Sequence, residues 1–179
     1  MDGSQTTAPL NRPPFAVPAE LIGRGVALRP QTEGDLNFLR DLYISLRWDE
    51  LAPVIDWTEA RKIAFLEEQF GFQHRHYTEY YTRTDFMIVE AGGKPVGRLY
   101  LDRGHPKDLR IVDIGFLPEW RRQGLGTAFI TAVQGEARAE GKFVSIHVET
   151  FNPARRLYHR MGFREISQNG CYWLMEWHP

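Results

Sequence analysis

A glycine-rich segment in the middle of the chain has the residue types that bind phosphate. Arg121 is followed by Gly124 and Gly126, and the segment joins an apolar, strand-like run at 111–117 to a helical pattern. Glycine lets the main chain approach a ligand where a Cβ would collide, and the first N–H groups of a helix attract anions. The spacing differs from the P-loop and from the dinucleotide-binding fingerprint. It favours a diphosphate held by a shorter loop, with an ordinary strand-to-helix turn as the alternative.

A second segment places polar side chains directly after another strand. Residues 143–149 alternate as in a strand, Asn152 and Pro153 suit the start of a short helix, and Gly162 suits its end. Tyr158 then lies on or beside the apolar face of this helix. Its phenol is therefore either buried or available for chemistry.

Together the two segments resemble the GCN5-related N-acetyltransferase (GNAT) superfamily. The first matches the family's Gln/Arg-x-x-Gly-x-Gly/Ala pyrophosphate loop, and residues 152–163 match its Asn…Ala…Leu-Tyr…Gly-Phe segment in the same order and at the usual distance. Residues 26–36 resemble the family's opening strand and helix, so the resemblance covers roughly residues 20–178. It implies acetyl-CoA as co-substrate and transfer of an acetyl group to a primary amine of a small molecule or peptide.

The resemblance also implies an α/β fold with a mixed central sheet of six to seven strands and about four flanking helices. Two neighbouring parallel strands, at about 109–117 and 143–149, are expected to splay apart and admit acetyl-CoA. The implied cofactor contacts come from the first of these strands, from the phosphate loop and from the later short helix: Phe116, Leu117, Arg121, Arg122, Gln123, Gly124, Leu125, Gly126, Thr127, Asn152, Arg155 and Tyr158.

Thioester aminolysis needs an acid for the departing thiolate and a proton acceptor for the amine. The resemblance assigns the acid to Tyr158. Asp113 is one candidate base, because a carboxylate inside an apolar strand is costly unless it is paired, hydrated or functional. A bond to Arg98 is the equal alternative, and a strand bulge would change the face on which Asp113 lies. Glu149 is the second candidate base, and water alone is a further alternative. His147 lies two residues before Glu149 on the same face, where a lone histidine in a strand is more often structural.

The acceptor side is implied to lie between the loop after the first long helix and the last hairpin. These supply residues 47–50, 56–57 and 168–170. Aromatic rings beside carboxylates favour a cationic amine, and a solvated acidic loop with anchored tryptophans is the alternative. His74 and His76 stand two residues apart without a third ligand, so we predict no metal site.

The composition fits a small enzyme without a charged macromolecular partner. The 179 residues can bury a core, and 22 basic against 23 acidic residues give a net charge of −1, which excludes a basic surface for nucleic acid or membrane. With one cysteine, Cys171, and no signal-peptide or membrane-spanning pattern, we expect a cytoplasmic protein. The expected partner is a small-molecule or peptide amine, and a homodimer is allowed.

Two other classes of function remain open at this point: a catalytically silent acyl-CoA-binding or regulatory module on the same fold, and an unrelated phosphate-binding protein.

Residues 1–19 are expected to be a flexible tail, and 20–179 a single domain. Residues 72–83 have no clear pattern. The predicted elements are a strand at 26–29, helices at 36–46 and 59 to about 71, strands at 84–90, 95–101, 109–117 and 143–149, a helix from 125 that Gly141 ends, and a final hairpin at 163–167 and 171–177 turning at Asn169-Gly170.

Overall fold

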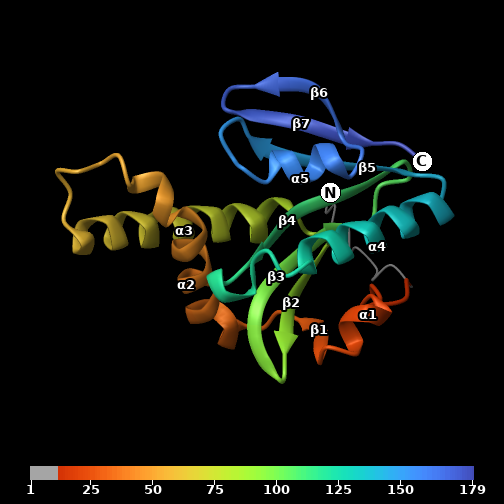
Figure 1. Ribbon diagram of the computed structural model, residues 1–179, viewed down its shortest axis with the longest axis horizontal. Coiled ribbons are helices and arrows are strands. Elements are labelled where there is room, and N and C mark those ends of the chain that lie inside the picture. The colour runs from red at the N-terminus through yellow and green to blue at the C-terminus, as the bar shows by residue number, and fades with distance from the viewer. Residues whose placement is uncertain (1–11) are drawn as a thin grey trace, which may run out of the picture.

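The computed structural model describes residues 12–179, which form a seven-stranded mixed sheet flanked by helices (Figure 1). The strand order is β1-β2-β3-β4-β5-β7-β6. Neighbouring strands are antiparallel except β4 and β5, which are parallel. The predicted mixed α/β sheet is thereby confirmed. The strands are β1 (Val26–Pro30), β2 (Thr84–Ala91), β3 (Lys94–Asp102), β4 (Asp108–Phe116), β5 (Phe143–Glu149), β6 (Arg164–Asn169) and β7 (Tyr172–Trp177).

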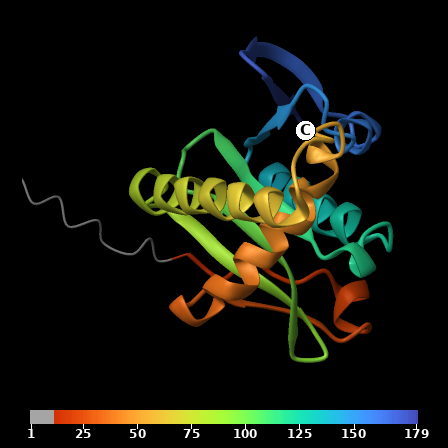
Figure 2. The ribbon, with the colours of Figure 1, turned by 90° about the vertical axis from the view of Figure 1, so that its left-hand side faces the viewer.

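Helices cover both faces of the sheet. Leu39 of α2 and Leu66 of α3 are buried against one face, whereas Phe129 of α4 and Tyr158 of α5 are buried against the other. Figure 2 shows α3 lying across the strands. About four helices were predicted, and the additional one in the described part of the chain is the single-turn α1. The helices are α1 (Ala19–Ile22), α2 (Leu36–Arg47), α3 (Glu59–Tyr80), α4 (Leu125–Ala139) and α5 (Arg155–Arg160).

The parallel strands β4 and β5 pair over only part of their length. The register runs from Asp108 opposite Phe143 to Ile111 opposite Ile146 and then stops. Beyond that point β4 remains bonded to β3, and β5 remains bonded to β7. Each strand is therefore held on its outer side while the inner edges separate, as the family resemblance implied.

A β-bulge lies where the two strands begin to separate. Asp113 stands opposite Tyr100 and Ile111 opposite Leu101, so Val112 is the extra residue. Asp113 consequently shares a face with Tyr100, which packs in the α2–α3 cluster, and not with Ile111, which packs on the α4 side. The bulge thus changes the parity of a regular strand and turns the carboxylate towards α3.

Helix α3 extends nine residues beyond the predicted end near Gly71. Thr58 caps its start by accepting the Arg61 N–H at 3.3 Å. The extension persists because aromatic side chains continue to pack along it: Phe70 stacks on His74 at 5.8 Å, and Tyr77 meets Tyr100 of the sheet at 5.9 Å. Tertiary packing here outweighs the low helix propensity of glycine.

Two further details differ from expectation. The final hairpin turns at Gly170 and Cys171, because Asn169 still pairs with Tyr172 inside the ladder.

Residues 1–11 of the expected tail lie outside the described residues. Residues 12–18 have no regular structure, yet Phe15 is only 6% exposed, and Arg103 Nη1 donates to the Pro13 carbonyl at 3.1 Å, so this part is packed against the domain and is not a free tail.

Within residues 12–179, no helix is both long enough and apolar enough to cross a membrane.

Gly97 provides a test of the contact between β3 and β4. A Cβ on this residue would lie 2.5 Å from the Gly115 carbonyl oxygen and from Phe116 Cδ1, so the main chain must shift. We expect Gly97→Ala to lower the free energy of unfolding by roughly 2 kcal/mol, as overpacking does. Gly71→Ala is the control: no atom lies within 4 Å of its added Cβ, and removing a helix-interior glycine should stabilise by about 0.5–1 kcal/mol. Urea unfolding measures both, and a neutral Gly97→Ala would contradict the packing.

Candidate active site

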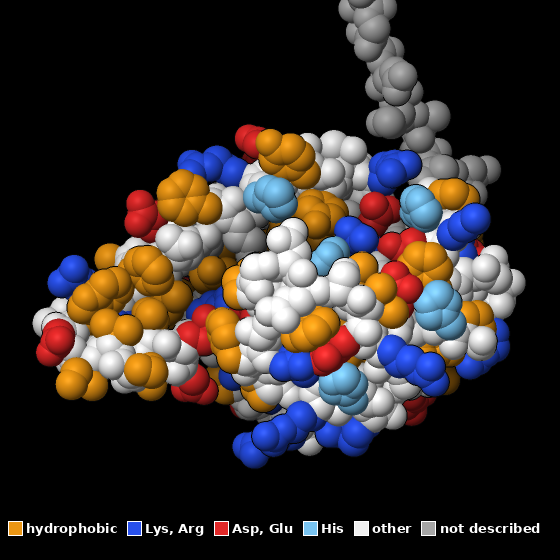
Figure 3. Space-filling view, turned by 90° about the horizontal axis from the view of Figure 1, so that it is seen from above, with side chains coloured by type: hydrophobic (Ala, Val, Ile, Leu, Met, Phe, Trp, Pro, Cys, Tyr) orange, Lys and Arg blue, Asp and Glu red, His pale blue; other side chains and the backbone are white. Residues whose placement is uncertain are grey.

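Two contiguous cavities open where β4 and β5 separate. The central cavity, of about 590 Å³, adjoins Asp113, Asn152 and Tyr158. The outer cavity, of about 740 Å³, extends along α3 towards Tyr81 and over β4 to Arg110. Seen from above, the surface is hollowed between the lobe of α2 and α3 and the rest of the molecule (Figure 3). Both cavities are lined by Tyr43, Arg47, Glu50, Gln73, Tyr77, Val112, His147, Glu149 and Tyr172.

The glycine loop presents unengaged main-chain donors at the start of α4. Arg122 and Gly124 adopt left-handed conformations, with φ of 57° and 84°. Within residues 12–179, none of the N–H groups from 122 to 127 donates a hydrogen bond. A Cβ on Gly124 would meet no atom within 4 Å, so the space in front of the loop is open. Oriented N–H groups, an adjoining helix dipole and open space form an anion-binding cradle.

The two arginines of the loop have different surroundings. Arg121 donates from Nε to the Phe116 carbonyl at 2.9 Å and from Nη2 to the carbonyl and hydroxyl oxygens of Ser45 at 2.9 and 3.0 Å. Its side chain therefore ties the end of β4 to α2. Arg122 is exposed, so its charge is the one available to a ligand of the loop. Arg24, which no sequence signal marked, also supports the loop by donating to the Gln123 carbonyl at 2.9 Å.

The end of β4 presents one free main-chain N–H to the cleft. The Leu117 N–H donates to the Val96 carbonyl at 2.9 Å, so this donor is already engaged with the neighbouring chain segment. N–H groups of successive strand residues point to opposite edges, and the Phe116 N–H accordingly faces the cleft. Phe116, and not Leu117, offers its main-chain donor to a ligand there.

Tyr158 lies at the inner end of the central cavity and is 5% exposed. Burial raises the pKa of its phenol, and the nearby Asp113 carboxylate raises it further. No protein group within the described residues forms a hydrogen bond with its hydroxyl. A buried, protonated and unengaged phenol facing a cavity is a suitable proton donor.

The segment that leads into α5 is built around Asn152. Its Oδ1 accepts the Ala154 N–H at 2.9 Å, and helix α5 begins at Arg155, two residues later than Pro153, where it was expected. Asn152 lines the central cavity. Arg155 lines neither cavity: it donates to the Thr150 carbonyl and to a carboxylate oxygen of Glu165, and so fastens the helix to the hairpin.

Asp113 is held in an ion pair. Arg98 Nη2 donates to its Oδ2 at 2.6 Å, and the Tyr77 hydroxyl donates to the same oxygen at 3.1 Å. The guanidinium is 3% exposed, so this is a largely buried pair. Of the two alternatives drawn from the sequence, the bond to Arg98 is the one present.

Glu149 is also engaged with a cation. Arg47 Nη1 donates to its two oxygens at 2.5 and 2.6 Å, and the Tyr172 hydroxyl donates at 3.2 Å. The same Arg47 nitrogen contacts Glu50 at 2.8 Å. One guanidinium therefore serves two carboxylates at the wall that both cavities share.

His147 faces the cleft two residues before Glu149. It is exposed and lines both cavities. Burial of part of its ring lowers the pKa of the imidazole, and the nearby Arg110 guanidinium lowers it further. The neutral form, which accepts a proton, is thus favoured at neutral pH. The sequence favoured a structural role for this histidine, and its spacing from Glu149 on the same face was the signal that could have marked it.

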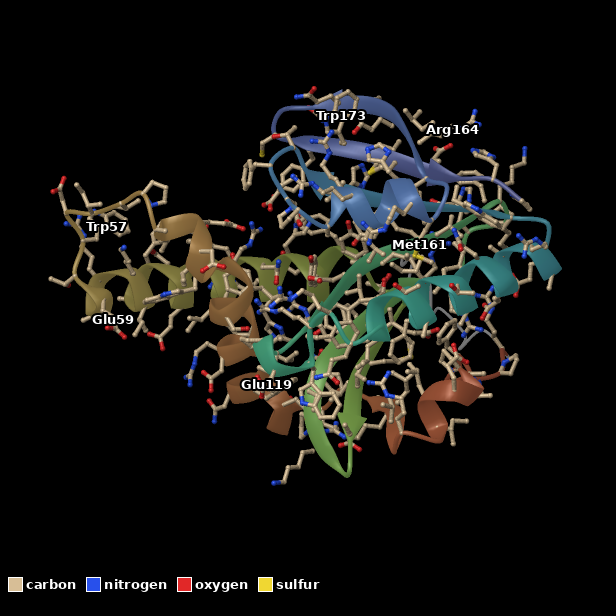
Figure 4. All side chains as sticks on the ribbon, viewed as in Figure 1. Trp57, Glu59, Glu119, Met161, Arg164 and Trp173 are labelled. Carbon is tan, nitrogen blue, oxygen red and sulfur yellow. The ribbon has the colours of Figure 1, made fainter. Side chains whose placement is uncertain are left out.

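The expected acceptor side is only partly assembled at the cleft. Glu50 lines both cavities and Asp49 lines the central one, whereas Asp56 and Trp57 line neither. Trp57 packs on Phe65 at 5.4 Å at the far end of the helical lobe, where Figure 4 labels it. Of residues 168–170, Asn169 alone lines the outer cavity. No group of three or more potential metal ligands occurs in the described residues.

Comparison with known proteins identifies similar sequences and folds. The sequence profile of the acetyltransferase (GNAT) family matches residues 48–163. No curated protein matches the chain by sequence.

Several solved structures share the fold at low identity. A PaiA N-acetyltransferase from Thermoplasma acidophilum, solved in complex with coenzyme A, has a TM-score of 0.64 at 15% identity over 86% of this chain and 99% of its own. A GNAT family acetyltransferase from Elizabethkingia anophelis with acetyl-CoA bound has a TM-score of 0.56 at 16% identity over 87% and 99%. An acetyltransferase from Thermus thermophilus has a TM-score of 0.58 at 20% identity over 84% and 94%.

The Asp113–Arg98 pair leads to a prediction about stability. Removing one partner of a buried ion pair leaves the other charge uncompensated, so Asp113→Asn should lower the free energy of unfolding by about 3 kcal/mol. Asp41→Asn is the control, because Asp41 and its partner Arg40 are both exposed and their pair should contribute under about 0.5 kcal/mol. Denaturant unfolding of both variants tests this, and unchanged stability in Asp113→Asn would show that the carboxylate has no structural role.

Proposed function

The chain belongs to the acetyltransferase (GNAT) family, and from this premise we propose that it is an acetyl-CoA-dependent N-acetyltransferase acting on a primary amine of a small molecule or peptide. The observation that carries the proposal is the row of unengaged N–H groups at 122–127, beside a cleft whose inner end holds Tyr158. A row of main-chain N–H donors alone could bind many different anions. The adjoining cleft with a protonated phenol adds what acyl transfer requires.

Each part of acetyl-CoA has a counterpart in the cleft. The pyrophosphate would accept hydrogen bonds from the loop at 122–127 and face the exposed Arg122. The pantetheine arm would follow the separated edge of β4 at Phe116, and Asn152 lines the opposite side. The thioester would then lie near Tyr158. The solved structures from Thermoplasma acidophilum and Elizabethkingia anophelis, which share this fold, contain coenzyme A and acetyl-CoA, and this supports the same cofactor here.

The reaction forms one bond and breaks another. The neutral amine attacks the thioester carbonyl carbon, a C–N bond forms, and the C–S bond breaks. Tyr158, which burial keeps protonated, would give its proton to the departing thiolate. The amine must lose a proton in the same sequence of steps.

His147 is the proton acceptor that the site favours. Protonation would neutralise Asp113 beside the buried Arg98, and would neutralise Glu149, the less exposed of the two carboxylates bonded to Arg47. Either change would weaken the compensation of a guanidinium held at low exposure. His147 is exposed to both cavities and its neutral form is favoured, so it can receive the proton directly or through one water.

Cofactor binding tests the loop. Acetyl-CoA should raise the melting temperature of the parent protein by linkage, and Gly124→Val should abolish that shift, because the valine side chain would occupy the open space before the donors. Gly93→Val is matched for backbone strain, with φ of 75° against 84°, and lies in the β2–β3 turn. It should lose intrinsic stability but keep the acetyl-CoA shift. Full affinity in Gly124→Val would overturn the loop assignment.

The role of Tyr158 predicts a separation of binding from turnover. Tyr158→Phe keeps the ring, so acetyl-CoA affinity should persist while kcat falls about 10²-fold, as expected for a lost general acid. Release of free thiol measures kcat, and Tyr80→Phe, at a tyrosine that is 72% exposed, is the control. Turnover equal to the parent's would make Tyr158 structural. Undetectable turnover in the parent with every amine would instead favour a silent acyl-CoA-binding module.

The role of His147 predicts a change in pH dependence. Since the imidazole must be neutral to accept a proton, kcat/KM should fall as the pH drops through its pKa, which burial places below the usual value. In His147→Gln the contribution of the imidazole to this acidic limb should disappear, and only the decrease caused by protonation of the amine itself should remain. Glu149→Gln should retain the limb. If the limb survives in His147→Gln and is lost in Glu149→Gln, Glu149 is the base.

A further inference from the structure

Four apolar or aromatic side chains form a wall along one side of the outer cavity: Leu51 from the 3₁₀ turn after α2, Phe65 and Phe72 of α3, and Tyr81 directly after α3. Phe72 is 51% exposed. The polar side chains of Gln69, Gln73 and His76 also line the cavity. Aromatic and branched aliphatic groups would gain from contact with the apolar wall, because that contact removes apolar surface from water.

The outer cavity offers no net negative charge to a cationic acceptor. The charged side chains that line it are two arginines, Arg47 and Arg110, and two glutamates, Glu50 and Glu149. Both glutamates are bonded to Arg47, so Arg110 is the cation of this lining whose charge faces a ligand.

One cation of the outer cavity retains spare donors. Arg110 donates from Nε to Ser145 Oγ at 3.2 Å, and its nearest carboxylate oxygen, on Asp108, lies 3.6 Å away. Within the described residues its terminal nitrogens donate no hydrogen bond, and a third of the side chain is exposed. A planar guanidinium with an open fork suits a carboxylate, which it can bind with two parallel hydrogen bonds.

Arg110 lies close to the proposed site of proton transfer. It stands opposite Ser145 in the β4–β5 ladder, two residues before the Val112 bulge, and His147 lies two residues beyond Ser145. Two strand residues span roughly 7 Å, a distance that an arginine side chain can bridge. An acceptor with its amine at His147 would thus hold a carboxylate on the same carbon within reach of Arg110.

We propose that the acceptor is an α-amino acid with an aromatic or branched aliphatic side chain, its carboxylate bound by Arg110 and its side chain on the apolar wall of the outer cavity. This rests on the proposed N-acetyltransferase function and names its substrate class. It replaces the cationic amine that the acidic loop suggested, because Asp56 and Trp57 lie away from the cleft.

Matched amines separate the contribution of the carboxylate from the contribution of the apolar side chain. Phenylalanine, phenethylamine and alanine differ by the carboxylate or by the ring, and spermidine represents a cationic acceptor. Acetylation is followed by thiol release, and binding to the enzyme loaded with the inert analogue desulfo-CoA is followed by calorimetry. Phenylalanine should exceed both phenethylamine and alanine in kcat/KM by at least about 10-fold, the effect of roughly 1.4 kcal/mol of binding free energy, with spermidine weakest. A preference for spermidine or phenethylamine would overturn the proposal.

Variants assign the carboxylate contact. Arg110→Gln should raise KM for phenylalanine about 10- to 100-fold with little change in kcat, and leave phenethylamine unaffected, because uniform binding is lost. Arg164→Gln is the matched control: this strand arginine is exposed on β6 and lines neither cavity. Figure 4 labels it. Equal KM for phenylalanine in parent and Arg110→Gln would overturn the assignment.

Thiol release and calorimetric binding test the acetyltransferase function and the substrate class separately. If no amine releases thiol, the N-acetyltransferase function fails. The calorimetric affinities for phenylalanine and phenethylamine, in the parent and in Arg110→Gln, still decide whether the cavity binds an amino acid through its carboxylate.

Discussion

The separation of β4 from β5 beyond Ile111 is the constraint on which the site depends. Because β3 and β7 hold the two strands on their outer sides, the inner edges can part without unfolding the sheet. The bulge at Val112 lies at the point of separation and turns the neighbouring carboxylate towards α3. The cavity, the exposed main-chain edge and the ends of both strands follow from this one interruption of the ladder.

Charge compensation then decides which side chains remain available for chemistry. Arginines on other elements bind the carboxylates that interrupt the apolar strands, Arg98 on β3 and Arg47 at the end of α2. These pairs are held at low exposure, where an unpaired charge would be costly. What remains beside the cleft is a phenol kept protonated, an imidazole kept neutral and a guanidinium with unused donors.

Features encoded by local sequence were predictable, and features set by tertiary contacts were not. The glycine loop and the phenol after Asn152 follow from short-range spacing, and both lie at the cleft. The side of the sheet that Asp113 faces depends on a bulge that only the pairing with β3 defines. The length of α3 beyond Gly71 depends on aromatic contacts with distant strands. The residue types of Asp56 and Trp57 suggested a binding site, but Trp57 packs on Phe65 at the far end of the helical lobe, away from the cleft.

The Arg121 side chain connects two structures that would contact different substrates. It joins Ser45, two residues before the Arg47 that walls the acceptor cavity, to the carbonyl of Phe116 on the cofactor edge. A displacement of α2 would therefore strain the contact with the main chain of β4. If binding on one side moves α2, linkage requires that binding on the other side responds by the same factor. This single guanidinium thus joins the two sides of the cleft by hydrogen bonds that neither substrate has to supply.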